Sequence, residues 1–172
     1  MAPIASDGAF RPRKIRRADQ SDLAVVQRIS ADAYIAAYVR VLGYVPLPAE
    51  EDYSPRIQRG EVWILVCGDS DVGIAVLEER RDHLLIYSIA VRPTEQGRGH
   101  GSALLDFADQ RAIALGLAVI RLYTNVRMEK NIGLYRRHGY VEAGTRPHPS
   151  RTGEVLVDMT RPVPRSSSLR GC

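Results

Sequence analysis

The chain has 172 residues, 45% of them hydrophobic and 26% charged, which suits one domain with its own core and leaves too little chain for two. Its formal net charge is +4, but no window holds five or six consecutive charges of the same sign, which argues against binding to nucleic acid or to a membrane surface. The two cysteines have neither the spacing of a metal site nor that of a disulfide framework, and no secretory signal is evident, so we expect a cytoplasmic protein. No run of 18 apolar residues occurs, so we expect no membrane span.

We expect a single domain over residues 13–161, and its first elements lie in the first third of the chain. A strand at residues 14–18 is followed by an amphipathic helix with Ser21 as its N-cap, which ends near Gly43. A proline-rich connection follows, with a brief helix around residues 49–59. The two ends of the chain are small, polar and proline-containing, and we expect them to be flexible over residues 1–12 and 162–172.

The middle of the chain predicts strands around a glycine-rich loop. Two β-branched runs at residues 62–67 and 72–78 form an expected hairpin, and the run at 83–91 is apolar over nearly its whole length, as in a central strand covered on both faces. The glycine loop follows directly, then a helix that ends at Gly116 and a strand at 118–125. This order is a βαβ-type unit.

The last third predicts a second short helix that ends at Gly139. Two final strands follow at residues 140–146 and 155–161, on either side of a turn rich in proline, serine and glycine.

The loop carries glycines at alternate positions, Gly97, Gly99 and Gly101. Glycine permits φ > 0 and a close approach to the backbone, so that N–H groups can converge on a phosphate at a helix N-terminus. Arg98 and His100 can add positive charge, and Ser102 can cap the helix and offer a hydroxyl. A tight turn without any ligand is the alternative.

Two common phosphate loops are excluded by the residues present. A nucleoside-triphosphate P-loop needs a glycine where this chain has Ser102 and then a lysine, and no lysine lies between residues 15 and 129. The dinucleotide pattern G-x-G-x-x-G fails as well, because Ser102 or Leu104 stands where its third glycine belongs.

What remains is Gln96-x-x-Gly99-x-Gly101 after an apolar strand, and here the sequence resembles the GCN5-related N-acetyltransferase (GNAT) family. The resemblance continues through "NIGLYRRHGY" and covers about residues 13–160. It implies an α/β fold with a mixed, largely antiparallel sheet of six or seven strands and about four helices. It also implies acetyl-CoA as co-substrate and no metal, with cofactor contacts from Ile89, Ala90, Val91, Gln96, Gly97, Arg98, Gly99, His100, Gly101, Ser102 and Asn131.

Tyr135 stands at the position of the family's general acid, which protonates the departing thiolate and typically contributes about 10² to 10⁴ in rate. Its alternative is a core tyrosine packed beside Leu134. Asn131, one turn earlier, matches the family's cofactor-contacting asparagine, with a residue at the start of the helix as the alternative.

The acceptor amine needs a base, because an amine with a pKa of about 10.4 is only about one part in a thousand neutral near pH 7. Many GNAT relatives carry a glutamate on the strand before the glycine loop, whereas this strand has Tyr87 and Ser88. The base is therefore unassigned. Four nearby groups are expected at the surface: Glu78, Glu79, His83 and His148.

The resemblance implies an acceptor pocket built from the first helix, the following loop and the last hairpin. Acids at residues 50–52 can attract a cationic amine or form the solvated start of a helix. The residues concerned are Tyr34, Tyr38, Tyr44, Glu50, Glu51, Asp52 and the segment 146–153.

The sequence thus favours a cytoplasmic enzyme that transfers an acetyl group from acetyl-CoA to the amine of a small molecule or peptide by direct attack in a ternary complex. A non-catalytic acyl-CoA-binding regulator is the alternative, because the strand acid is missing. A nucleic-acid binder is disfavoured by the dispersed arginines. The resemblance allows a homodimer.

Overall fold

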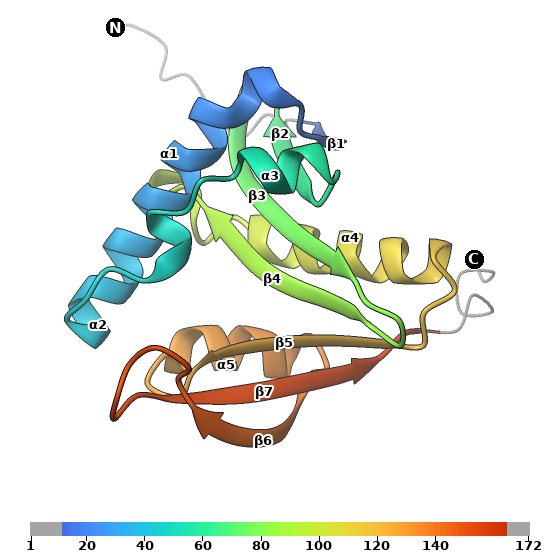
Figure 1. The fold of residues 1–172 in the computed structure, drawn as a ribbon. Coiled ribbons are helices and arrows are strands. Elements are labelled where there is room, and N and C mark those ends of the chain that lie inside the picture. The colour runs from blue at the N-terminus through green and yellow to red at the C-terminus, as the bar shows by residue number, and fades with distance from the viewer. Residues whose placement is uncertain (1–11, 165–172) are drawn as a thin grey trace, which may run out of the picture.

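The computed structural model describes residues 12–164, which form a seven-stranded sheet flanked by helices (Figure 1). The sheet order is β1-β2-β3-β4-β5-β7-β6, and only the β4–β5 pair is parallel. This confirms the expected mixed, largely antiparallel sheet. The strands are β1 (Arg13–Arg17), β2 (Val62–Cys67), β3 (Ser70–Glu79), β4 (Leu84–Val91), β5 (Val119–Asn125), β6 (Val141–Pro147) and β7 (Val155–Pro162).

The helices lie on both faces of this sheet. Those of four residues or more are α1 (Leu23–Tyr34), a π-helical turn (Ile35–Val39), α3 (Ser54–Gln58), α4 (His100–Ala114) and α5 (Glu129–Arg137). Shorter pieces are α2 (Arg40–Leu42) and 3₁₀ turns at Gln20–Asp22, Leu47–Ala49 and Pro93–Glu95. Within residues 12–164, none of the helices is long and apolar enough to cross a membrane. The predicted flexible ends lie almost wholly outside the described residues.

The core consists of two hydrophobic clusters, one on each face of the sheet. Buried residues of α1 and α3 pack on β2, β3 and β4, among them Ile29, Ile57 and Ile74. Buried residues of α4 and α5, among them Leu104 and Ile132, pack on the opposite face. Within the described residues, the face of β5, β7 and β6 on the α1 side carries no helix and faces the viewer (Figure 1).

The N-terminus of the first helical segment differs from the sequence prediction. The cap is Asp19 rather than Ser21: the Asp19 carboxylate accepts a bond from the Ser21 N–H at 2.8 Å, and the Asp22 carboxylate accepts one from the Asp19 N–H at 2.9 Å. Asp22 is held in place by Arg16 of β1, whose guanidinium bonds to both its oxygens. The C-terminal prediction is confirmed, because the segment ends at Gly43 with φ of 80°.

Candidate functional site

The two central strands separate part of the way along their length. β4 pairs with β5 only over residues 84–86, opposite 120–122, and the strands then diverge towards the glycine loop (Figure 1). The β3–β4 register shifts at the same place, so that Tyr87 has no partner on β3. A bulge of this kind bends a strand and increases its twist. The bulge therefore accounts for the separation.

The separated part of β4 contains Ile89, Ala90 and Val91, the residues expected to contact the cofactor. On the side towards β5, this part of β4 has no paired strand among the described residues. Backbone groups on such an edge can bind an extended, amide-containing ligand as an added strand.

The three glycines of the loop differ in what their positions require. Gly97 and Gly99 both have φ of 77°, a left-handed conformation that glycine adopts without strain. Gly101 lies in the first turn of α4, where a Cβ atom would come within 3.4 Å of the Leu134 side chain of α5. Gly99, not Ser102, is the N-cap of α4, and the hydroxyl-bearing residue lies within the helix, so the capping prediction for Ser102 is wrong.

The charges around the loop are fewer than the sequence suggests. Arg98 is exposed and lies 3.3 Å from Glu95, while its backbone carbonyl accepts a 2.6 Å bond from Arg13. His100 is 3% exposed, and burial together with Arg13 lowers its pKa, so that it is neutral near pH 7. The expectation of positive charge from His100 is therefore wrong. Gln96 donates a 3.1 Å bond to the Val91 carbonyl, which ties the loop to the end of β4.

A group of phenols joins the helices on the two faces. Asn131 of α5 donates a bond to the Tyr38 hydroxyl at 2.9 Å, and the Tyr34 and Ser88 hydroxyls are 2.8 Å apart. Burial raises the pKa of Tyr135, as do, to a smaller extent, the neighbouring phenols Tyr38 and Tyr140. Tyr135 therefore holds its proton at neutral pH.

The three acids at residues 50–52 have different environments. Glu50 is exposed, and so is Asp52, which precedes the N-cap Tyr53 and accepts a 2.9 Å bond from the N–H of Ser54, the first residue of α3. Glu51 instead faces inward and accepts a 2.7 Å bond from the Tyr87 hydroxyl. The prediction that these acids form the solvated start of a helix is therefore right for Glu50 and Asp52 and wrong for Glu51. Glu78, expected at the surface, is also largely buried, with 12% of its side chain exposed.

The far side of the acceptor region is closed by the β6–β7 loop. Arg151 stacks on the Tyr44 ring at 3.8 Å and donates a 3.0 Å bond to the Val45 carbonyl. Asn125, at the end of β5, donates a 2.6 Å bond to Glu154. The segment after α2 is thus fastened to the last hairpin.

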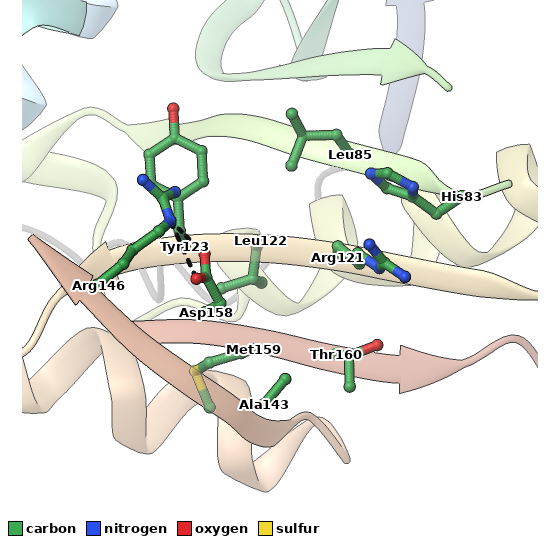
Figure 2. Close-up of a pocket in the computed structure, with 10 residues that line it drawn as sticks. All are labelled: His83, Leu85, Arg121, Leu122, Tyr123, Ala143, Arg146, Asp158, Met159 and Thr160. Atoms are coloured by element: carbon green, nitrogen blue, oxygen red, sulfur yellow. Dashed lines mark hydrogen bonds and ion pairs between the residues drawn. The ribbon is translucent and has the colours of Figure 1, made fainter. Parts of the chain in front are cut away.

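A cavity of about 510 Å³ lies on the open face of the sheet, beside the paired part of β4 and β5 (Figure 2). Leu85 and Ala143 contribute apolar surface. Arg146 extends from β6, lies over the Tyr123 ring at 4.9 Å and donates to both carboxylate oxygens of Asp158 at 3.0 and 3.1 Å (Figure 2). Sequence reasoning missed most of this cavity because its residues come from β4, β5, β6 and β7 and from the turn before β4, and no local pattern marks them.

Comparison with known sequences identifies one domain family. Residues 58–142 match the sequence model of the acetyltransferase (GNAT) domain, a range that contains β2, β3, β4, the glycine loop, α4, β5 and α5. No curated protein sequence matches the chain.

Solved structures with the same fold are numerous. The ribosomal-protein-S18-alanine N-acetyltransferase of Escherichia coli is 21% identical, with a TM-score of 0.71 over 90% of this chain and 96% of that one. Ard1 of Thermoplasma volcanium is 21% identical, with a TM-score of 0.72 over 89% and 99%. YncA of Salmonella typhimurium, solved with its cofactor acetyl-CoA, is 20% identical, with a TM-score of 0.68 over 94% and 99%. At these identities the similarity establishes the fold.

Proposed function

The chain belongs to the GNAT family of acetyl-CoA-dependent N-acetyltransferases, and we propose that it transfers an acetyl group from acetyl-CoA to a primary amine by direct attack in a ternary complex. The observation that carries the proposal is the bulge at Tyr87, after which β4 leaves β5 and runs into the glycine loop. Acetyl-CoA is a long ligand with a pyrophosphate, two amides and a terminal thioester. It needs such an edge next to an anion site.

The pyrophosphate would be held by backbone N–H groups of residues 97–102. These groups start the 15-residue helix α4, whose N-terminus carries roughly half a positive charge. The pantetheine arm would lie along the free edge of β4, where Ile89, Ala90 and Val91 provide backbone groups. Asn131 would contact the cofactor from α5.

Acetyl transfer passes through a tetrahedral oxyanion and then expels a thiolate. The Val91 N–H would polarise the thioester carbonyl and stabilise the oxyanion. Tyr135 would donate its proton to the departing sulfur, whose conjugate acid has a pKa of about 8.5 by the cysteine reference. A phenol that is still protonated at neutral pH is able to donate in this way.

The acceptor would approach from the side of α1 and the β6–β7 loop. Tyr34, Tyr38 and Tyr44 lie there together with Glu51 and Glu154. Aromatic rings attract a cationic amine rather than an anion. A small molecule or peptide with a primary amine is therefore the proposed class of acceptor.

Calorimetric titration with acetyl-CoA tests the proposal, with ATP and NAD as controls. We expect binding of acetyl-CoA alone, weakened by Gly101→Glu, which places a charged side chain against α5, and largely kept by Gly101→Ala. Release of the free thiol would then be followed with spermidine, L-lysine and an alanine tetrapeptide as amines. Absence of acetyl-CoA binding would overturn the proposal, and binding without transfer to any amine would favour the acyl-CoA-binding regulator.

A further inference from the structure

The bulge in β4 turns two consecutive side chains towards the same face of the sheet. Ser88 contacts Tyr34 of α1, and Tyr87 contacts Glu51, which precedes α3. Successive residues of a regular strand point to opposite faces, and a bulge removes this alternation. The loop before α3 thereby brings a carboxylate to the strand position where β4 itself has none.

Arg56 fixes the orientation of both members of this contact. Its Nε donates a 2.6 Å bond to Glu51 Oε1, which leaves Oε2 for the Tyr87 hydroxyl at 2.7 Å. Its guanidinium also lies over the Tyr87 ring, 3.6 Å from the ring centre. Glu51 is 18% exposed and Arg56 12% exposed, so the pair is largely shielded but still reaches water.

The charges around Arg56 balance without any ligand. Its other guanidinium contacts are Glu61 at 3.1 Å and Glu78 at 2.6 Å, and these two acids also bind the exposed arginines Arg59 and Arg80. Three carboxylates thus meet three arginines. Glu51 alone of the three acids also bonds a group on the separating strand.

We propose that Tyr87 and Glu51 take the proton from the acceptor amine, with Tyr87 as the catalytic residue and Glu51 as the proton acceptor behind it. This inference rests on the proposed acetyl transfer. Tyr87 sits at the bulge, where β4 and β5 separate, and its hydroxyl donates to Glu51.

The transfer balances in atoms and charge. The acceptor ammonium first loses one proton to water, the nitrogen lone pair then forms the bond to the acetyl carbon, and a remaining N–H proton passes to Tyr87 Oη as the Tyr87 proton passes to Glu51 Oε2. The C–S bond breaks, and the thiolate receives the Tyr135 proton. Glu51 then loses its proton to water, and Tyr135 regains one.

The acid-base order is consistent with this route. Burial and the bond to Glu51 raise the pKa of Tyr87, so the phenol stays protonated and donates to the carboxylate while its oxygen can still accept. The ammonium proton becomes far more acidic once nitrogen is bonded to the carbonyl carbon, so a carboxylate suffices as the final acceptor. The groups facing Glu51 and Tyr87 are Arg56, Glu61, Glu78, Arg80, Tyr53 and Tyr123.

Glu51→Gln, Tyr87→Phe and the double variant test this inference, with Glu61→Gln as matched control. Glu61 binds the same Arg56 but makes no hydrogen bond to Tyr87. The probe is the amine among spermidine, L-lysine and the alanine tetrapeptide with the highest kcat/KM, followed from pH 6 to pH 10. Acetyl-CoA titration of every variant checks that the cofactor site is intact.

We expect Glu51→Gln and Tyr87→Phe each to lower kcat/KM at least tenfold at pH 7, with a loss that shrinks towards pH 10 as hydroxide takes over removal of the proton from the attacking nitrogen. The double variant should be no worse than either single one, and Glu61→Gln should stay within about twofold of wild type. A loss that is equal at every pH, or an unchanged profile, would overturn the proton role alone. No transfer by the wild type to any of the three amines would overturn the proposed function and this role with it.

Discussion

The Asn131 side-chain amide donates a 2.9 Å hydrogen bond to the Tyr38 hydroxyl, and this bond joins α5 on one face of the sheet to the first helical segment on the other. The two elements can meet because β4 and β5 have separated by this point. The side chain expected to bind the cofactor is thus already held by a residue of the acceptor side.

Tyr38→Phe removes this bond while keeping the ring and its contact with Tyr34, whose ring centre is 4.9 Å away. The variant should lose about 1 kcal/mol of unfolding free energy, because the Asn131 amide is left without its partner. Urea denaturation measures this loss. Asn131→Ala should lose a similar amount and also weaken acetyl-CoA binding. Equal acetyl-CoA affinity in Asn131→Ala and wild type would remove Asn131 from the cofactor site.

Tyr135→Phe should lower turnover at least tenfold and leave acetyl-CoA affinity nearly unchanged. The ring and its edge contact with Tyr140, at 6.1 Å between centres, remain in the variant, so only the proton donor is lost. Steady-state kinetics with the amine chosen above, together with calorimetry, measure both quantities. Tyr140→Phe is the control, because its buried hydroxyl has no hydrogen-bond partner among the described residues. Similar turnover in the two variants would mean that Tyr135 is a packing residue.

The sequence predicted the elements well because their signals are local. The run at residues 83–91 became β4, and Gly43, Gly116 and Gly139 all have the positive φ that ends a helix. The N-cap was wrong because Asp19 and Ser21 are both suitable caps, and Arg16 decides between them by binding Asp22 from a neighbouring strand.

The candidate site was only partly predictable for the same reason. Glu50, Glu51 and Asp52 are alike in sequence, and only the packing of α3 against β4 turns one of them towards Tyr87. The absence of an acid on β4 was visible in the sequence. Its spatial replacement was not, because the two residues are 36 positions apart.

Gly99→Ala should weaken acetyl-CoA binding at least tenfold, because a side chain at φ of 77° is strained and redirects the N–H groups of the loop. Gly116→Ala is the matched control: it has φ of 68°, has nothing within 4 Å of an added Cβ, and ends α4 far from the loop. Both variants should lose about 1 kcal/mol of stability, measured by thermal unfolding. Loss of affinity in both would show that general destabilisation, and not the loop, governs binding.

His100 should make the protein less stable as the pH falls below about 6.5, the ordinary value for a histidine. Burial and the charge of Arg13 lower its pKa in the folded state, so the unfolded chain takes up a proton first as the pH falls. The stabilising preference for the neutral ring is therefore complete above the unfolded pKa and declines below it. Thermal unfolding between pH 7.5 and 5.5 should show a smaller loss for His100→Gln than for wild type. If His100→Gln and wild type lose stability in parallel over this range, the pKa of His100 is not lowered in the folded protein.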